Sequence, residues 1–181
     1  MFKRMSSLFL GGCLIMGLAA CGDADVEKVE ADTNSTSDTG SEPKKEKPTE
    51  QSLKIGESVN FDGLIITLNE ARIEPGGEFD NPDNDQFLVV NLTAENTTDT
   101  EQTVSSVMNV ELKDAEGYSY NTTIMLEGVK AQFDGSVEAG GKLRGEIPFD
   151  VPNSDEYSLS FSNPFKSGKA IWVIPASELS K

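Results

Sequence analysis

The strongest constraint on the fold is an alternation of apolar and polar residues that recurs along the chain from residue 53 onward. It is clearest at Tyr157, Leu159 and Phe161, which alternate with serines. Successive side chains of a strand point to opposite faces of a sheet, so a period of two predicts strands with one buried face. No segment of this region has a convincing helical period, apart from a single turn expected near 123–130.

We predict about seven or eight short strands, separated by turn signals, which is typical of a β-sandwich or barrel. Residues 87–94 are apolar on both faces where the segment begins, which predicts a strand in the middle of a sheet. The alternation changes phase at 69–70, which predicts a β-bulge. Pro148 has no N–H to donate and predicts an edge strand or a bulge. The side chains expected to face the core are Ile55, Val59, Phe61, Leu64, Ile66, Leu68, Ala71, Ile73, Leu88, Val90, Leu92, Ala94, Met108, Val110, Leu112, Ile147, Phe149, Val151, Tyr157, Leu159 and Phe161.

The N-terminus has the layout of a secretory signal, with two basic residues, an apolar run and then small residues. The apolar run, about 14 residues, is shorter than the ~20 that a membrane-spanning helix needs. The tetrapeptide Leu18-Ala19-Ala20-Cys21 resembles the lipobox of bacterial lipoproteins, in which the cysteine thiol receives a diacylglycerol with fatty acyl chains such as palmitate. We therefore expect a signal peptide at 1–20, cleavage before Cys21, and lipidation of Cys21.

Two alternatives remain open for this segment. A second lipobox-like tetrapeptide ends at Cys13, although the apolar run before it is shorter. An ordinary secretory signal would leave Cys21 unmodified. Cleavage before Cys21 would leave one cysteine in the mature chain, so no intramolecular disulfide could form and the exported domain would depend on its core.

A polar segment separates the lipobox from the alternating region. Residues 21–52 are rich in Glu, Ser, Thr, Asp, Lys and Pro. Such a composition cannot bury enough apolar surface to offset the entropy of ordering, so we expect a disordered tether. Its mean span would be roughly 30 Å. The remainder, 53–181, has the length of one ordinary domain.

Charge and composition exclude several classes of function. The chain has 31 acidic and 15 basic residues, and its net charge of −16 would repel nucleic acid. It contains no histidine, and an acylated cysteine cannot act as a nucleophile. Ser-His-Asp and Cys-His sites and the usual zinc sites are thereby excluded. We expect neither catalytic residues nor a cofactor other than the metal considered next.

The candidate metal site is the acidic segment 78–85, which contains Asp80, Asp83 and Asp85. Calcium takes six to eight oxygen ligands, several of them carboxylates, and neighbouring acids in a loop would supply them. The spacing does not match an EF-hand, and the stretch 81–83 is also good turn chemistry. A solvated turn is the favoured interpretation, and Ca²⁺ binding is the alternative.

Several segments are similar to one known family: IGESVNFDGLIITLNEARIE, QFLVVNLTAENTTDTEQTVSS, ELKDAEGYSY and AGGKLRGEIPFDVP. The most telling features are Asn96, the turn at 114–118 and the glycine-containing strand at 141–152. They resemble the telokin-like, immunoglobulin-like domain of unknown function found in surface lipoproteins of Gram-positive bacteria. A secreted mycobacterial antigen has a similar fold. The resemblance implies an immunoglobulin-like β-sandwich over nearly all of 53–181, and it supplies no catalytic residues.

We therefore expect a lipoprotein on the extracytoplasmic face of the membrane of a Gram-positive bacterium. Its immunoglobulin-like β-sandwich would be a binding domain, and its partner a surface or secreted protein or a glycan. The alternative is a calcium-dependent binding or sensing module. Loops carry binding more often than sheets do, so the expected positions are 76–86 and the connection 121–139, chiefly 129–133.

Overall fold

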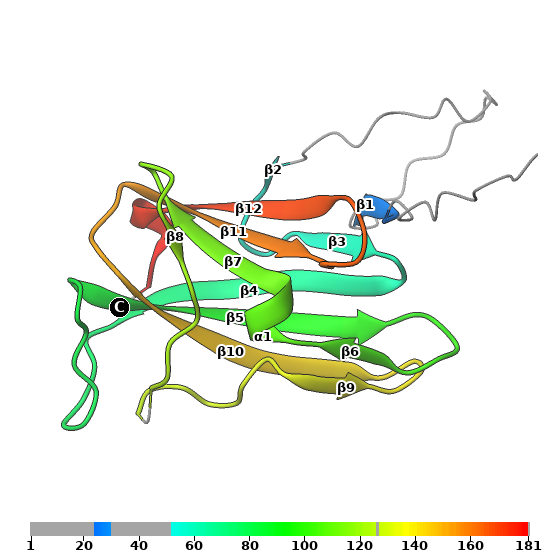
Figure 1. Cartoon of the computed structure of the whole chain (residues 1–181), viewed down its shortest axis with the longest axis horizontal. Helices are drawn as coiled ribbons and strands as arrows, with labels where there is room; N and C mark the ends of the chain where they lie inside the picture. The colour runs from blue at the N-terminus through cyan, green and yellow to red at the C-terminus, as the bar shows by residue number, and fades with distance from the viewer. Residues whose placement is uncertain (1–23, 30–51, 126, 181) are drawn as a thin grey trace, which may run out of the picture.

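The computed structural model describes residues 24–29, 52–125 and 127–180 (Figure 1). The predicted signal peptide, the lipobox residues Leu18, Ala19 and Ala20, and Cys21 lie outside these residues. The elements, in chain order, are β1 (Val26–Val29), β2 (Ser52–Leu53), β3 (Ser58–Phe61), β4 (Leu64–Glu74), β5 (Gln86–Asn96), β6 (Gln102–Val104), α1 (Ser106–Asn109), β7 (Val110–Asp114), β8 (Ser119–Tyr120), β9 (Gly135–Val137), β10 (Lys142–Val151), β11 (Glu156–Ser162), β12 (Lys169–Pro175) and the 3₁₀ helix η1 (Ala176–Glu178).

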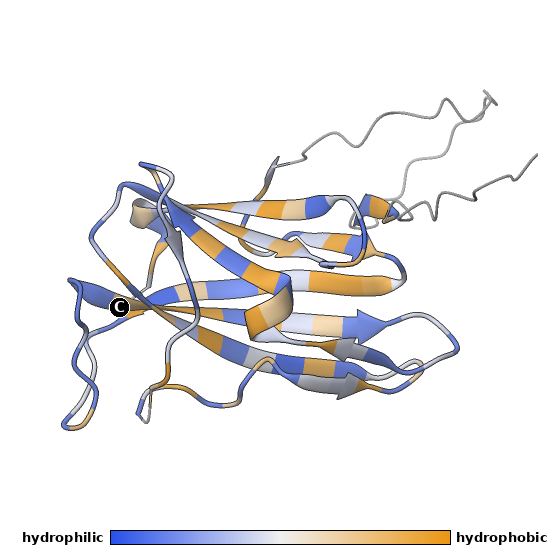
Figure 2. Cartoon of the chain, viewed as in Figure 1, coloured by the Kyte–Doolittle hydropathy of each residue, from blue (hydrophilic) through white to orange (hydrophobic). Residues whose placement is uncertain are grey.

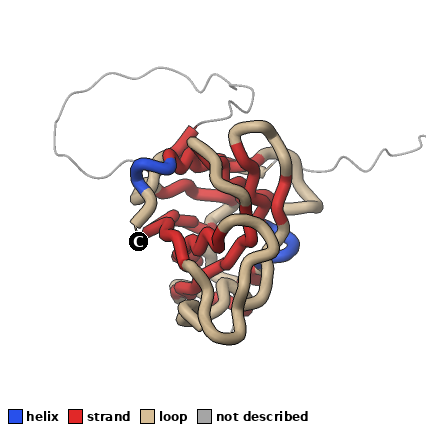
Figure 3. Tube along the Cα trace, turned by 90° about the vertical axis from the view of Figure 1, so that its left-hand side faces the viewer, coloured by secondary structure: helices blue, strands red, loops and turns tan. Residues whose placement is uncertain are grey.

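The strands form two five-stranded sheets that enclose one core, so the predicted β-sandwich is confirmed. The first sheet has the order β1-β3-β4-β5-β10, and the second has the order β2-β12-β11-β7-β8. A small third sheet pairs β6 with β9. The described residues contain more strands than predicted because several have only two to four residues. In the end-on view of Figure 3, the two short helices lie on opposite sides of the strands. The immunoglobulin-like connectivity stays a prediction.

The core lies between the sheets and follows the period of two in the sequence. The strands in Figure 2 alternate between apolar and polar residues along their length. Ile66 and Leu92 of the first sheet share one buried cluster with Leu112 and Trp172 of the second. Burial of these side chains from water drives the two sheets together. The indole N–H of Trp172 is satisfied, since it donates to the Glu57 carbonyl oxygen at 3.0 Å.

Three long strands give the first sheet its frame, and their features were predicted. The central position of β5 is confirmed, since it lies between β4 and β10. The predicted bulge is confirmed by a shift of the β4–β5 register between Leu68 and Glu70. Pro148 lies in β10, which ends the sheet order and is an edge strand, as a proline in a sheet requires.

Two local predictions were wrong. Met108 is 55% exposed rather than part of the core, because a helical turn, α1, precedes β7 and breaks the alternation there. That turn is held by Asp134, whose carboxylate accepts hydrogen bonds from the N–H and hydroxyl of Ser106. No helix forms among the described residues of 123–130, where one was expected.

Part of the segment predicted to be a tether, residues 26–29, forms the strand β1. Residues 26–29 pair with β3 in antiparallel register, beginning with Val26 opposite Phe61. Lys28 Nζ lies 2.6 Å from Glu57 Oε1, and the Asp62 N–H donates to the Asp25 carbonyl at 2.9 Å. The short VEKV segment thus covers the edge of β3 and lengthens the first sheet by one strand (Figure 1).

Candidate functional site

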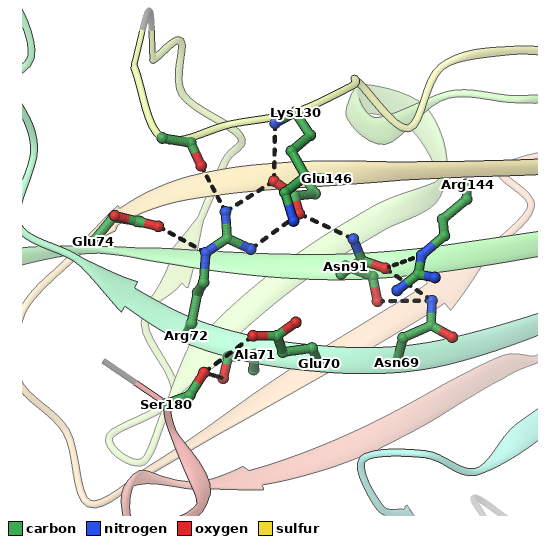
Figure 4. Close-up of polar contacts among 11 residues, drawn as sticks. Asn69, Glu70, Ala71, Arg72, Glu74, Asn91, Lys130, Arg144, Glu146 and Ser180 are labelled. Carbon is green, nitrogen blue, oxygen red and sulfur yellow. Dashed lines mark hydrogen bonds and ion pairs between the residues drawn. The ribbon is translucent and has the colours of Figure 1, made fainter.

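The first sheet carries a polar network on the side that faces away from the core. Its centre is the ion pair between Arg72 of β4 and Glu146 of β10 (Figure 4). Two parallel hydrogen bonds join them, from Nη1 to Oε1 at 3.0 Å and from Nη2 to Oε2 at 2.9 Å. Only 1% of the Glu146 side chain and 13% of the Arg72 side chain is exposed. This is the bidentate geometry that gives guanidinium–carboxylate pairs their strength.

Two further donors form hydrogen bonds with the Glu146 carboxylate. Asn91 Nδ2 donates to Oε1 and the Lys130 N–H donates to Oε2, each at 3.0 Å. Burial alone would raise the pKa of Glu146, but the hydrogen bonds from Arg72, the Lys130 backbone and Asn91 outweigh burial and lower it to about 2. The same pair raises the pKa of Arg72, chiefly through the hydrogen bond to Glu146. Both groups are therefore ionised at neutral pH.

The network also holds the connection 127–133 against the edge of the sheet. Arg72 Nη2 donates to the Gly128 carbonyl oxygen at 2.6 Å, and Gln132 forms a bridge with Glu146. A side chain at Gly145 would come within 2.5 Å of the Gln132 and Phe133 backbone, so only glycine permits this close approach. Phe133 is fully buried in the core. The predicted binding segment 129–133 is therefore fixed near both of its ends, by the hydrogen bond from the Lys130 N–H to Glu146 and by burial of Phe133.

A pocket of about 330 Å³ opens beside this connection. It is lined by Asn91, Lys130, Ala131, Arg144, Gly145 and Glu146. Asn91 forms part of its wall and is held in place, since its Oδ1 accepts from Arg144 Nε at 2.8 Å and from Asn69 Nδ2 at 3.0 Å. Lys130 and Arg144 are exposed to solvent. The pocket thus combines a fixed polar wall with two exposed cations.

A larger pocket, about 570 Å³, lies at the turn between β7 and β8. Its Asp114 accepts hydrogen bonds from the N–H groups of Glu116 and Tyr118 and from the Tyr120 hydroxyl at 2.7 Å. The hydrogen bond to Asp114 is the main cause that raises the pKa of Tyr120 to about 12. These bonds tie the β7–β8 turn together, so Asp114 has a structural role already.

The calcium candidates are not assembled into one site. Asp80 Oδ2 accepts from the Glu127 N–H, and Asp85 Oδ2 accepts from the Asn153 N–H, each at 2.8 Å. The Asp83 N–H donates to Asp150 Oδ2 at 2.7 Å. Among the described residues, no group of three or more His, Cys, Asp or Glu side chains is placed to hold a metal ion. Asp80 and Asp85 instead accept hydrogen bonds from the backbones of distant segments, and Asp80 is buried, whereas the favoured interpretation was a solvated turn. Binding of Ca²⁺ stays a prediction.

Neither the Arg72–Glu146 pair nor the pocket was predicted from the sequence. The two residues are 74 positions apart, so no local spacing relates them. The available signal was Gly145, a glycine inside a strand pattern, which indicates close approach of another backbone.

In the part of the chain that the structure describes, no helix has the length and apolar character needed to cross a membrane.

Comparisons with known proteins agree with the fold. A family model described as a domain of unknown function, DUF4352, matches residues 53–171. A candidate lipoprotein of Bacillus subtilis, ycdA, aligns with a TM-score of 0.54 and 17% identity over 73% of this chain and 40% of its own length, so this chain spans less than half of that protein. The yjhA protein of the same organism aligns with a TM-score of 0.52 and 16% identity over 67% of this chain and 98% of its own length.

Two further comparisons complete these results. The secreted protein MPT63 of Mycobacterium tuberculosis has a TM-score of 0.49 and 13% identity over 70% of this chain and 98% of its own. Comparison with curated proteins finds no match. At identities below 25%, the matches to ycdA and yjhA support the sandwich fold and nothing more specific.

Proposed function

The chain belongs to the family described as a domain of unknown function, DUF4352, and we propose that it is a membrane-anchored, extracytoplasmic binding module without catalytic activity. The observation that carries the binding role is the pocket between β5, β10 and the 127–133 connection. Its wall is held by a fully hydrogen-bonded network, so the pocket is formed before any ligand arrives. Ligand sites are usually largely preformed in this way.

The anchor is the lipid expected on Cys21. The lipobox Leu18-Ala19-Ala20-Cys21 supports it, and so does the fold shared with a candidate lipoprotein of Bacillus subtilis. A Gram-positive host, with the domain on the outer face of its single membrane, agrees with that neighbour. A lipoprotein with two or more acyl chains stays on a bilayer, because each buried CH₂ contributes about 0.8 kcal/mol.

Strand β1 changes how an anchored domain would be presented. It begins at Val26, only five residues after Cys21. Five residues span at most about 18 Å, so pairing of β1 with β3 keeps the sandwich close to the bilayer. The polar segment 30–51 then lies between two strands of the domain rather than between the lipid and the domain. A tether that lifts the domain roughly 30 Å from the membrane is therefore not part of the proposal.

A non-catalytic role agrees with the chemistry of the site. Glu146 is the buried carboxylate of the pocket, and Arg72 keeps it ionised and occupied on both oxygens. A general acid or base needs a pKa near the working pH and access to substrate, and Glu146 has neither. The absence of histidine from the sequence supports the same proposal.

The anchor is tested by replacing Cys21 with serine and separating membranes from soluble proteins. We expect Cys21→Ser to move the protein from the membrane fraction to the soluble fraction, because the thiol that would take the lipid is gone. Cys13→Ser is the matched control and should stay with the membranes. A Cys21→Ser protein that sediments with membranes as the unaltered protein does would overturn the proposed anchor. Release by Cys13→Ser alone would move the anchor to the earlier cysteine.

A further inference from the structure

The domain is strongly acidic overall, whereas the pocket is lined by two basic side chains. Residues 53–181 include 22 acidic and nine basic residues, for a net charge of −13. Five other basic side chains lie against carboxylates: Lys28 on Glu57, Arg72 on Glu74 and Glu146, Lys113 on Glu111, Lys142 on Glu95, and Lys166 on Asp62. Lys130 and Arg144 form no ion pair with any carboxylate that the structure describes, and both line the same pocket.

The guanidinium of Arg144 is held with its outer edge available. Its Nε donates to Asn91 Oδ1 at 2.8 Å, and Asn91 is itself buried and bonded to Glu146. The two terminal nitrogens of Arg144 make no hydrogen bond to the described residues, as Figure 4 shows. This fork of donors matches a carboxylate or a phosphate, to which arginine donates two parallel hydrogen bonds.

The acid in the pocket does not cancel this attraction. Glu146 is neutralised by Arg72 through two hydrogen bonds, so that pair contributes no net charge. Arg72 is shared with Glu74, so the three cations Arg72, Lys130 and Arg144 exceed the two carboxylates by one charge, and the pocket is locally positive on an otherwise acidic surface. Opposite charge at a concave site raises the local concentration of anionic ligands.

We propose that this pocket binds a small molecule through a carboxylate or phosphate group, with Arg144 donating two hydrogen bonds to the oxyanion and Lys130 supplying the second positive charge. The inference rests on the proposed binding function and names its ligand class. A volume of about 330 Å³ is at the lower end of small-molecule sites, which are roughly 300–1,000 Å³. Ala131 and Gly145 line the pocket beside the cations.

The test is a titration of the purified full-length protein with inorganic phosphate, acetate or chloride at matched ionic strength. The sequence contains three arginines, Arg4, Arg72 and Arg144, and the expected cleavage before Cys21 removes Arg4, so only two arginine side-chain Nε–H signals need to be assigned by NMR. We expect a saturable shift of the Arg144 Nε–H signal with phosphate or acetate and no saturable shift with chloride. The oxyanion that binds with the lower dissociation constant, phosphate or acetate, identifies the group that the pocket prefers. The Arg72 signal should move little, because Glu146 and Glu74 already occupy that side chain.

Variants separate this site from general charge effects, with changes in binding read from the shift of the Asn91 side-chain amide. Arg144→Gln should weaken oxyanion binding about tenfold or more, because the charged hydrogen bonds to the oxyanion are lost. Arg144→Lys should retain only part of the affinity, because lysine keeps the charge but lacks the two parallel donors. Lys130→Gln should weaken binding less. The control is Lys142→Gln, which removes an exposed cation from the same strand, and binding should be unchanged because Lys142 is paired with Glu95.

The proposal is overturned if neither oxyanion gives a saturable shift, or if Lys142→Gln weakens binding as much as Arg144→Gln does. A thermal melt of each variant at the unaltered midpoint shows that a loss of binding is not a loss of folding. Failure of this titration, with Cys21→Ser still released from membranes, would reject the ligand class and leave the anchor intact.

Discussion

Replacing Glu146 with alanine is expected to lower the free energy of unfolding by about 3 kcal/mol, because the largely buried Arg72 would lose its bidentate partner and keep only the more exposed Glu74. The Asn91 amide and the Lys130 N–H would lose their acceptors in the same step. Urea unfolding at pH 7 measures the loss. The matched control is Glu74→Ala, which removes the other carboxylate on Arg72 and leaves the buried one in place. Because Glu74 is more exposed, its loss should cost about 1 kcal/mol or less.

The double variant Arg72→Met with Glu146→Met removes both charges. It should be more stable than Glu146→Ala, since an apolar pair leaves no buried charge without a partner. Equal stability of Glu146→Ala and Glu74→Ala would contradict the view that the buried pair organises this side of the sheet.

The pH dependence of stability follows from the same pair. The pKa of Glu146 is about 2 in the folded chain and 4.5 as its ordinary value. A lowered folded-state pKa contributes stability above the ordinary value, and that contribution disappears as the pH falls from about 4.5 toward about 2. The difference in stability between the unaltered protein and Glu146→Gln should therefore shrink over this window. A difference that stays constant down to pH 2 would show that the carboxylate is not held ionised.

Replacing Phe133 with alanine is expected to cost about 3–5 kcal/mol, as truncation of a buried phenylalanine usually does. Phe133 is fully buried although it lies in a connection between strands. Phe165 is the matched control, because it is 76% exposed in the β11–β12 connection. Phe165→Ala should change the unfolding free energy by no more than about 0.5 kcal/mol. Both are measured by urea unfolding.

This comparison tests whether the 127–133 connection is part of the packed domain or a free loop. A free loop would tolerate Phe133→Ala as well as Phe165→Ala. The backbone of the connection packs directly against Gly145 of β10, so we expect Phe133→Ala to destabilise the domain far more than Phe165→Ala does. Loss of Phe133 should also broaden the NMR signals of Lys130 and Ala131, because they line the pocket next to it.

The strands could be predicted because burial in a sandwich imposes a period of two that is local in the sequence. Tyr157, Leu159 and Phe161 alternate without interruption, and all three are buried. The prediction for Met108 was wrong because its place in the core depended on a strand that begins two residues later, at Val110. The sandwich itself follows from many such segments, so single errors of this kind did not change it.

The site could not be predicted in the same way, because it depends on residues brought together from distant parts of the chain. Nothing near Arg72 in the sequence indicates Glu146 as its partner, and an acidic chain offers many carboxylates. Strand β1 was missed because the polar composition of 21–52 outweighed the two valines at 26 and 29. The contacts of Asp80 and Asp85 could not be predicted, because each accepts a hydrogen bond from a backbone N–H far along the chain, at Glu127 and at Asn153.

The most direct test of a surface binding module is site-specific photocrosslinking in intact cells. A photoreactive p-benzoylphenylalanine is placed at Ala131, which is exposed at the pocket, and at Glu111, which is exposed on β7 of the opposite sheet. Intact-mass measurement of the recovered protein detects an adduct of any size. The proposed function predicts an adduct from position 131 that disappears when Arg144→Gln is added, and none from position 111. No adduct at position 131, or the same adduct from both positions, would contradict it.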